Sequence, residues 1–533
     1  MLLPLVSVTL FLLSFPLAQY DVSFWPLSFF CLAPLFAYLE RTESPWKLFC
    51  AGCIWGSLMS LGLAYWLFYA MVWQYGTPVT AALIFMIIGL MLPHGAVYGL
   101  FALVYAMLKK DGPLFRLLAV PSIWVVAEYS REAIPLLVPW GFLGYALQPW
   151  NLMVQMADIT GLYGLSFLLV MVNSCILLVW RRIDPGRLRS ARTPAAIAGE
   201  IVPALAANRV PLAVVAALLI AAASYGAARR HLIRSDAAAS LSLGRGMPVS
   251  IAQGNFTQKE RWNDAGFFER LNVSIGLSER CLPRREEGAG PVRRSLIVWP
   301  ETILNSQGQI TGGLFKFLRS RIGPDATLIV GGVRKGPAGR GVYNTAYIVS
   351  GGESESVRYY DKNILLPYAE TAPFGSFLGD FYTAPAAFLQ GDTPPAARTD
   401  AGTAGLSICF EAVYPGHIAR SVRDGARFLV NISNDGWFGR TSEPVLHLRQ
   451  SSLRAVENRR YLVRAANNGF SAIISPDGSI KRTGLFATEC LSGEILPLSN
   501  RTIYSIAGDW IVYAAALILI ISFAAILFRK SEP

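Results

Sequence analysis

Residues Leu406–Glu411 read LSICFE and are followed by AVYPG at 412–416. An apolar run of strand-forming residues ends on a cysteine and an acid, and a Pro-Gly break then interrupts it. This pattern predicts a buried strand that delivers Cys409 to a loop at its carboxyl end, where binding and catalytic residues gather. A thiol in that position can attack a carbonyl carbon if a neighbouring group takes its proton. The alternative is a small buried cysteine that only packs.

Strands and helices alternate on both sides of this stretch. Further strands are predicted at 248–253, 295–302, 327–332, 342–349, 356–360, 428–433, 462–466 and 470–475, and helices at 259–280, 312–322, 414–424 and 443–460. Such alternation predicts an α/β layered fold whose chemistry sits at strand ends.

Two other predicted strand ends carry groups that complement a thiol. One closes with Trp299-Pro300-Glu301-Thr302 and the other with Tyr360-Asp361-Lys362. A carboxylate can take the thiol proton, and an ammonium group can lower the thiol pKa and stabilise a developing oxyanion. Taken singly, each residue has an ordinary structural alternative. Glu301 would then cap the following turn, and Lys362 would be a surface charge.

The remainder of the chain is strongly apolar. Of its 533 residues, 53% are hydrophobic and only 15% are charged, whereas soluble domains are about one quarter charged. Apolar blocks fill the chain up to about Tyr225 and return at 511–528, but the composition between them is that of a soluble protein. We therefore predict a membrane domain at 1–228, a linker at 229–246, a water-facing domain at 247–500 and a final transmembrane helix at 508–528.

The apolar blocks predict eight membrane spans, since about 20 residues cross a bilayer. They lie at about 3–18, 24–40, 48–72, 79–107, 115–130, 158–180, 210–227 and 508–528. Lys and Arg concentrate in the loops after the second, fourth, sixth and eighth spans, which predicts that these loops and both termini are cytoplasmic. The domain at 247–500 is then expected on the opposite side of the membrane. Arg229, Arg230 and Arg234 argue against this, but long domains translocate largely regardless of charge.

Other classes of protein fit the sequence less well. The cytoplasmic loops hold much of the net charge of +12, and no aromatic and basic platform is evident, so we expect no nucleic-acid partner. Seven cysteines are too few for a disulfide framework, and whether Cys281 pairs with Cys490 stays open. The four histidines form no pattern typical of ligands, so we expect no metal site.

The order of the motifs resembles the Glu-Lys-Cys triad of the nitrilase superfamily. One branch is similar in more detail, the apolipoprotein N-acyltransferases of bacterial inner membranes. The segments that carry this similarity are Gln253–Asn255, Trp299–Thr302, Tyr360–Lys362, Cys409–Glu411, Asn434–Gly439 and Arg454–Glu457. Seven spans, an outside domain and an eighth span also resemble that branch, whereas soluble nitrilases lack the spans.

The resemblance implies an α-helical membrane domain of about eight transmembrane helices plus a nitrilase-like α-β-β-α sandwich. It also implies a ping-pong acyl transfer. Cys409 would attack a phospholipid ester with Glu301 as general base, and Lys362 with the backbone N–H after the cysteine would hold the oxyanion. The resulting thioester would pass its acyl chain to the α-amino group of a diacylglyceryl-cysteine apolipoprotein. The family needs no metal or organic cofactor, and we expect a monomer.

The resemblance further assigns supporting residues. Glu370 and Glu411 match acids around the triad, and Trp262 and Trp437 match aromatic positions in substrate-facing loops. Trp140 is expected either to line the access route from the membrane or to act as an interfacial anchor. The family commonly has Tyr directly after the nucleophile. This chain has Phe410 instead, so any role of that hydroxyl is absent here, whereas the aromatic ring can still pack against an acyl chain.

Three other hypotheses remain. A membrane-tethered nitrilase-type amidase would hydrolyse a small C–N bond, but such an enzyme has no need of eight spans. A transporter or lipid-binding protein could carry an inactive nitrilase fold, but all three triad positions are filled here and the spans hold few interior charges. A papain-like Cys–His enzyme fits least well, because neither His417 nor His447 lies in a suitable setting.

Overall fold

The computed structural model of the chain describes residues 1–109, 112–134, 137–261, 264–281, 294–305, 308, 310–351, 357–367, 369–371 and 388–531. The chain divides into two units. The first, here called the helical unit, comprises Met1–Tyr65, Ala82–Ala228 and Asp509–Pro533. The second, here called the sandwich unit, comprises Trp66–Ala81 and Arg229–Gly508.

Apolar helices that pack against one another form the helical unit. The main pairs are α3 (Pro45–Ala64) with α6 (Leu92–Leu108) and α7 (Pro113–Ala133) with α9 (Ala157–Trp180). Glycines allow the first pair to approach closely, because a Cβ atom on Gly52 would lie only 2.1 Å from the main-chain oxygen of Tyr98. The other helices are α1 (Leu2–Leu13), η1 (Trp25–Phe29), α2 (Ala33–Arg41), α5 (Val79–Ile84), η3 (Phe85–Met91), η4 (Leu143–Leu147), α8 (Asn151–Val154), α10 (Pro185–Ser190), α11 (Pro194–Ala207), α12 (Arg209–Ser242) and α19 (Trp510–Ser531). Residues 79–81 of α5 and 229–242 of α12 are counted with the sandwich unit.

Five helices of the described chain are long and apolar enough to cross a membrane. They are Pro45–Ala64, Val79–Leu108, Ala157–Trp180, Arg209–Ser242 and Trp510–Leu527. Each overlaps one of the eight predicted spans. The helical membrane domain is thus confirmed as a class, whereas the number eight stays a prediction.

The three other predicted spans correspond to shorter or more polar helices. The span predicted at 3–18 contains α1, which has 12 residues. The span at 24–40 is split into η1 and α2, because each piece starts anew at a proline that suits the first turn of a helix. The span at 115–130 is α7, a single helix that buries Glu128 and Arg131.

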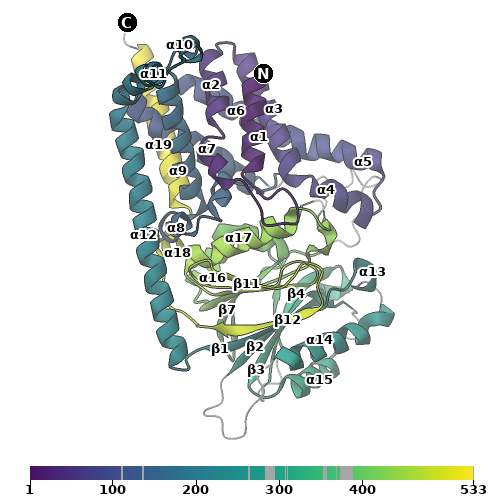
Figure 1. Cartoon of the computed structure of the whole chain (residues 1–533). Coiled ribbons are helices and arrows are strands. Elements are labelled where there is room, and N and C mark those ends of the chain that lie inside the picture. Colours follow the sequence, from purple (N-terminus) through teal and green to yellow (C-terminus); the bar gives the residue numbers. More distant parts are fainter. Residues whose placement is uncertain are drawn as a thin grey trace. The chain divides into compact units, whose positions relative to one another are not determined.

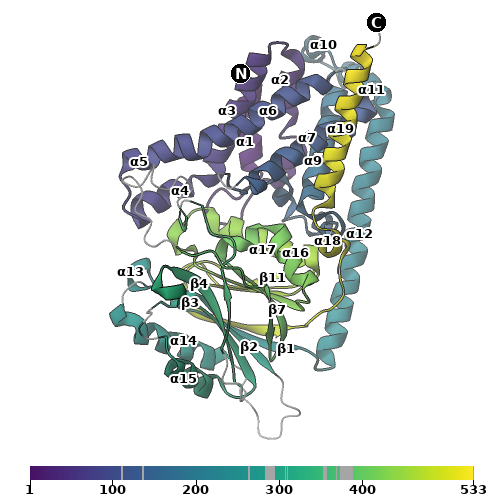
Figure 2. The same cartoon turned by 180° about the vertical axis from the view of Figure 1, so that it is seen from behind.

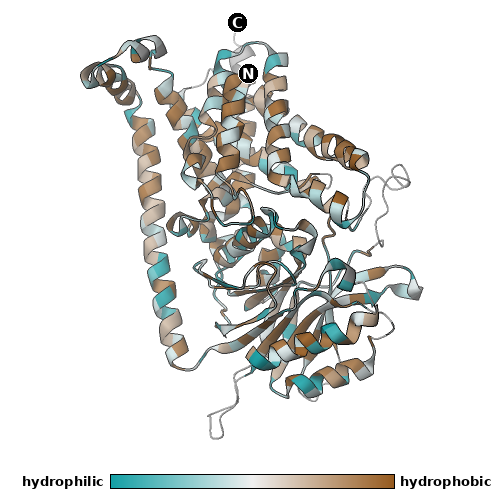
Figure 3. Cartoon of the chain, turned by 45° about the vertical axis from the view of Figure 1, so that its right-hand side comes forward, coloured by the Kyte–Doolittle hydropathy of each residue, from teal (hydrophilic) through white to brown (hydrophobic). Residues whose placement is uncertain are grey.

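The long helix α12 changes character along its length. Its first part is apolar, and the stretch after Ala228 mixes charged and polar residues with apolar ones (Figure 3). The residues expected to form a linker, 229–246, instead continue this helix to Ser242. They can do so because no proline or glycine occurs between Ala227 and Leu243, and alanine favours the helix.

Two six-stranded sheets form the centre of the sandwich unit (Figure 1). The first has the order β12-β1-β2-β3-β4-β5 and the second β11-β10-β9-β8-β7-β6. Neighbours β1, β2 and β3 run parallel, as do β7, β8 and β9. The bounds are β1 Met247–Gln253, β2 Ser295–Leu304, β3 Ala326–Lys335, β4 Val342–Ser350, β5 Arg358–Asp361, β6 Ala396–Thr399, β7 Gly402–Ile408, β8 Phe428–Ser433, β9 Leu462–Ala466, β10 Ala472–Ile474, β11 Ile480–Arg482 and β12 Glu489–Ile495.

Helices cover the outer face of each sheet. The first sheet packs against α14 (Phe267–Cys281) and α15 (Gly312–Ile322), and the second against α16 (Pro415–Arg423) and α17 (Glu443–Asn458). The inner faces meet through β1 and β2 on one side and β8 and β9 on the other. Figures 1 and 2 show these four layers from opposite sides. The predicted α-β-β-α sandwich is confirmed.

Three strands escaped the sequence analysis, namely β6, β11 and β12. Strand β12 reads ECLSGEI and keeps only two of its seven side chains buried, so it lacks the apolar signal of a core strand. It nevertheless pairs along its whole length with β1. A disulfide between Cys281 and Cys490 joins α14 to β12, which answers the question that the sequence left open.

The segment Trp66–Ala81 belongs to the sandwich unit, although the sequence placed most of it within predicted spans. It begins with two short helices, α4 (Trp66–Tyr69) and η2 (Ala70–Gln74). Its aromatic residues explain the grouping. Trp66 packs edge-on against Phe438 with ring centroids 4.8 Å apart, and Tyr75 stacks on Trp437.

Candidate active site

Glu301 lies in an irregular part of β2. The pairing between β2 and β3 shifts register between Trp299 and Leu304, so β2 bulges where Pro300 and Glu301 occur. Glycine permits the close approach of β3 at this point, because a Cβ atom on Gly331 would lie 2.5 Å from the Glu301 Cα. Bulges of this kind redirect a side chain. They are common beside active sites.

The Glu301 carboxylate is held by a residue that the sequence analysis did not identify. Asn344 on β4 donates a hydrogen bond from Nδ2 to Glu301 Oε1 at 2.6 Å. The same amide group lies 3.3 Å from Glu370 Oε1. Asn344 thus links two of the predicted acids, and its position in the middle of an ordinary-looking strand gave no signal in the sequence.

Lys362 directly follows β5 and is almost completely buried. Its Nζ lies 2.8 Å from Glu370 Oε1 and 2.7 Å from Oε2. Burial alone would lower the pKa of the Lys362 ammonium group. Glu370, Cys409 and Glu301 outweigh burial and raise that pKa above its ordinary value. Lys362 therefore stays positively charged beside the predicted nucleophile.

Cys409 is the first residue after β7, as predicted, and opens the short helix η8 (Cys409–Val413). Its backbone adopts a left-handed conformation with φ of 54°, which is uncommon for a residue other than glycine. Burial raises the pKa of the Cys409 thiol, the charge of Glu301 raises it further, and Lys362 opposes both effects. The thiol is therefore protonated at neutral pH and needs a base in order to attack.

Glu411 connects the turn after β7 to the loop that carries Lys362. Its carboxylate accepts hydrogen bonds from the main-chain N–H groups of Ile408, Asn363 and Ile364 at 2.6–2.9 Å. The hydroxyl of Tyr360 donates to both Glu411 oxygens, at 2.8 and 2.9 Å. Glu411 thereby fixes the spacing between the ammonium group and the thiol.

The predicted aromatic residues have different surroundings. Phe410 is buried and packs edge-on against Tyr414, with ring centroids 5.1 Å apart. Trp437, in η9 (Asp435–Phe438), stacks on Tyr75 with ring centroids 4.5 Å apart. Trp140 is buried in the helical unit, where its main-chain oxygen accepts a hydrogen bond from Arg131. Trp262 lies outside the described residues.

A buried cluster close to Cys409 was not predicted. Asp435, Glu443 and His447 place possible ligand atoms within 4.8 Å of one another, although the histidine pattern of the sequence indicated no such group. Arg464 from β9 lies in the same cluster and donates hydrogen bonds to both Asp435 oxygens. A resident positive charge thus already balances the Asp435 carboxylate.

Comparisons with known proteins cover both units. Residues 9–175 match the family model described as the N-terminal domain of apolipoprotein N-acyltransferase, and residues 273–496 match the carbon-nitrogen hydrolase model. The apolipoprotein N-acyltransferase of Geobacter metallireducens is 30% identical over 100% of this chain and 96% of its own length. That of Azotobacter vinelandii is 29% identical over 97% and 93%. That of Bradyrhizobium diazoefficiens is 29% identical over 81% and 76%.

Proposed function

The chain belongs to the apolipoprotein N-acyltransferase family, and on that premise we propose that it acylates lipoproteins through a thioester on Cys409. The acyl donor is a phospholipid. The acceptor is the N-terminal α-amino group of an apolipoprotein that carries diacylglyceryl-cysteine. The family resemblance noted from the motifs is confirmed by the relatives, whereas the triad and its supporting residues are part of this proposal.

The first half-reaction forms the acyl-enzyme. Glu301 takes the proton from the Cys409 thiol, and the sulfur attacks the ester carbonyl carbon of the phospholipid. Lys362 and the N–H of Phe410 stabilise the negative charge that develops on the carbonyl oxygen. The ester C–O bond then breaks, and the departing lysophospholipid oxygen receives the proton from Glu301.

The second half-reaction uses the same residues to transfer the acyl chain from Cys409 to the amine. The free amine of the apolipoprotein attacks the thioester carbon, since a thioester keeps the acyl group reactive towards amines. Glu301 takes a proton from the attacking amine. The C–S bond breaks, an amide is formed, and the proton returns to the Cys409 thiolate.

The environment of the thiol is the observation that carries the proposal. Cys409 is a buried thiol that interacts with the ammonium group of Lys362 and with three carboxylates, of which Glu301 has the largest effect and Asp435 and Glu370 smaller ones. A protonated thiol beside a base and a fixed positive charge is suited to acyl transfer. Glu370 keeps the Lys362 ammonium group in place.

The amidase hypothesis is not favoured. The relatives named as acyltransferases match the helical unit as well as the sandwich unit. A hydrolase of small amides in water has no use for apolar helices that admit lipid chains. Adding small amides and a diacylglyceryl peptide to the purified protein in parallel would distinguish the two activities.

We further propose where the enzyme works. It lies in the inner membrane as a monomer, with 1–228 and 508–528 in the membrane and 247–500 on the periplasmic side, and with both termini in the cytoplasm. The Cys281–Cys490 disulfide supports this arrangement, because structural disulfides form in oxidising compartments. The concentration of basic residues in alternate loops supports it as well.

Mass spectrometry of the Cys409 peptide tests the proposal directly. Purified protein is incubated with phospholipid alone, and a fatty-acyl mass is expected on Cys409. The mass should be absent from Cys409→Ala and from Glu301→Ala. Addition of a diacylglyceryl-cysteine peptide should then remove the acyl group from the enzyme and place it on the peptide amine.

Two results would refute the proposal. An unmodified thiol in folded wild-type protein would exclude the phospholipid as donor. An acyl-enzyme that releases fatty acid to water but never acylates the peptide would indicate a hydrolase.

A further inference from the structure

The main-chain oxygen of Cys409 accepts hydrogen bonds from two buried side chains that the acyl-transfer steps do not use. His447 Nε2 lies 3.1 Å from this oxygen. Asn431 Nδ2 lies 3.3 Å from it. The two donors come from different elements, His447 from α17 and Asn431 from β8.

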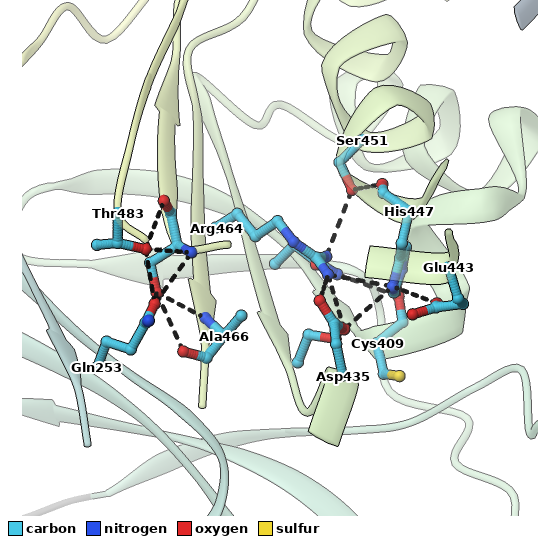
Figure 4. A network of polar contacts seen from close by, with 12 residues as sticks. Gln253, Cys409, Asp435, Glu443, His447, Ser451, Arg464, Ala466 and Thr483 are labelled. Atoms are coloured by element: carbon cyan, nitrogen blue, oxygen red, sulfur yellow. Dashed lines mark hydrogen bonds and ion pairs between the residues drawn. The ribbon is translucent and has the colours of Figure 1, made fainter. Parts of the chain in front are cut away.

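Arg464 on β9 holds both of these donors. Its Nη1 donates to Asn431 Oδ1, and its Nη2 lies 3.1 Å from His447 Nδ1. The same Nη2 lies 2.9 and 2.8 Å from the two Asp435 oxygens. The guanidinium group is fully buried. Figure 4 shows it at the centre of this network, with the Cys409 sulfur directed away from it.

The contacts of His447 fix its orientation. A carbonyl oxygen can only accept, so Nε2 carries the hydrogen that it donates to Cys409. Nδ1 then faces Arg464, Asp435 Oδ1 at 3.3 Å and Glu443 Oε1 at 3.4 Å. The imidazole ring is thus held from η9, α17 and β9 at once.

The geometry of the peptide bond links this network to the reaction. The Cys409 oxygen and the Phe410 N–H are opposite ends of one planar trans peptide unit. Donors that fix the oxygen on one side therefore fix the direction of the N–H on the other side. The left-handed backbone of Cys409 also requires these contacts, because such a conformation persists only where the surrounding residues hold it.

We propose that Arg464 is a positioning residue that, through His447 and Asn431, locks the Cys409–Phe410 peptide so that the Phe410 N–H points at the oxyanion. The inference rests on the proposed function, in which this N–H stabilises the tetrahedral intermediate. Arg464 touches neither the thiol nor the substrate. It acts by preventing the Cys409–Phe410 peptide plane from flipping.

Arg464→Lys is the test variant, and Arg460→Lys is its matched control. Lysine keeps the charge but cannot reach Asn431, His447 and Asp435 together, because it lacks the planar fork of arginine. Arg460 is equally buried and lies just before the same strand, but it donates to main-chain oxygens such as those of Ala426 and Asn500.

Two reactions of Cys409 distinguish a role of Arg464 in positioning the peptide from a general disruption of the site. A p-nitrophenyl acyl ester forms the acyl-enzyme through an oxyanion, and the burst of p-nitrophenolate gives its rate. Iodoacetamide alkylates the same thiol by direct displacement and forms no oxyanion. Arg464→Lys should slow the burst at saturating ester by about 10- to 100-fold, which is less than the cost of about 100- to 1,000-fold for losing one oxyanion donor, because the Phe410 N–H is misplaced and not removed. The KM and the alkylation rate should stay within about twofold of wild type.

The other variants sharpen the test. Arg460→Lys should leave both reactions unchanged. His447→Leu should resemble Arg464→Lys, and His447→Gln should recover part of the burst rate, because glutamine still offers an N–H.

Two outcomes would overturn the inference. One is a wild-type burst rate in Arg464→Lys. The other is an equal fall of burst and alkylation rates, which would indicate a merely structural role. A wild-type protein that reacts with the ester but not with phospholipid would refute the proposed function. The burst and alkylation rates of the variants would still test this inference.

Discussion

At the scale of single residues, the site combines a thiol that resists ionisation with a nearby carboxylate and a nearby ammonium group. Burial raises the pKa of the Cys409 thiol, and the neighbouring Glu301 carboxylate raises it further. Lys362 acts in the opposite sense, since its positive charge favours the thiolate. The rate of alkylation at a fixed pH follows the thiolate fraction. It therefore measures how these charges affect the pKa of the thiol, independently of acyl transfer.

The two charges should shift alkylation in opposite directions. Glu301→Gln removes a negative charge, so the pKa of the thiol should fall and iodoacetamide should react faster at pH 8. Lys362→Met removes a positive charge, so the pKa should rise and the reaction should slow. A shift of one pKa unit changes the thiolate fraction about tenfold. Both variants should form less acyl-enzyme from phospholipid. A slower alkylation of Glu301→Gln would contradict this arrangement of charges.

Glu411 offers a second test at this scale. Glu411→Gln replaces an oxygen that accepts main-chain N–H groups by an NH2 group that repels them. Hydrogen bonds to a charged group contribute about 1.5–3 kcal/mol each. We therefore expect acyl-enzyme formation to fall by at least about tenfold. Glu489→Gln, which removes a single exposed main-chain contact, is the control. Wild-type acylation by Glu411→Gln would show that the Lys362 loop needs no such link.

The three residues proposed as the triad stand out in the sequence because each sits where a strand ends or bends and carries a chemically specific group. Asn344 and Arg464 could not, since both lie inside strands and act through contacts with residues distant in the sequence. The sequence offered His447 no setting suited to a papain-like enzyme, and its contact with the Cys409 oxygen joins residues that are distant in the sequence. Residues that act on the peptide backbone leave no local pattern.

At the scale of elements, the turn between β10 and β11 anchors the polar part of α12. Asp477 in this turn accepts hydrogen bonds from Arg234 Nε at 2.8 Å and Arg230 Nε at 3.4 Å. From the sequence, Arg230 and Arg234 argued against the predicted orientation. The structure gives them a packing role instead. The charges of Arg230 and Arg234 therefore need not indicate how the chain is oriented in the membrane.

Asp477→Asn should destabilise the sandwich unit. Burial alone would raise the pKa of Asp477, but hydrogen bonds from Arg234 and Ser479 outweigh burial and lower that pKa. The charged form thus stabilises the fold fully above about pH 4, the usual value for an unfolded aspartate, and this contribution is lost as the pH falls through the lower folded value. We expect a cost of about 1–3 kcal/mol at pH 7 that shrinks below pH 4.

Thermal unfolding of Asp477→Asn and wild type in detergent, at pH 7 and at a pH below 4, would measure this loss of stability. Asp424→Asn is the matched control, because Asp424 is half-exposed and lies 3.8 Å from Arg420 on α16. Such pairs contribute at most about 1 kcal/mol. Equal effects of the two substitutions would contradict the anchoring role of Asp477.

Most elements of the sandwich could be predicted from apolar runs bounded by turns. Strand β8 occupies the predicted residues, and β9 does so as well. Strand β12 could not be predicted, because its pairing with β1 and the Cys281–Cys490 disulfide specify it in place of an apolar pattern. The register shift in β2 was equally hidden, since it depends on the approach of Gly331.

At the scale of the whole molecule, the number of membrane crossings decides on which side the sandwich unit lies. Of the five long apolar helices in the described residues, four precede residues 247–500 and one follows them. An even number of crossings would place the unit on the same side as the N-terminus. The proposed periplasmic location therefore requires an odd number of further crossings among the predicted spans at 3–18, 24–40 and 115–130.

The helix α7 is the best candidate for such a crossing. Its 21 residues extend over about 31 Å, the thickness of the apolar core of a bilayer. Three of its four charged residues, Arg116, Glu128 and Arg131, are buried, and Glu132 is partly buried. Glu128 accepts hydrogen bonds from Trp124 and from the main chain of Leu143, and Arg131 donates to the oxygen of Val138. Charges held inside a protein in this way are compatible with a spanning helix.

Labelling of single cysteines in intact cells would resolve the topology. Ser190 and Ser320 are both exposed, the first at the end of α10 and the second on α15. A membrane-impermeant maleimide should label Ser320→Cys in intact cells, and Ser190→Cys only after the inner membrane is opened. The mild nature of a Ser→Cys change leaves the basic residues that set orientation untouched. Labelling of both positions in intact cells, or of neither, would require an even number of crossings between them. It would exclude the predicted topology, in which α12 alone separates the two positions.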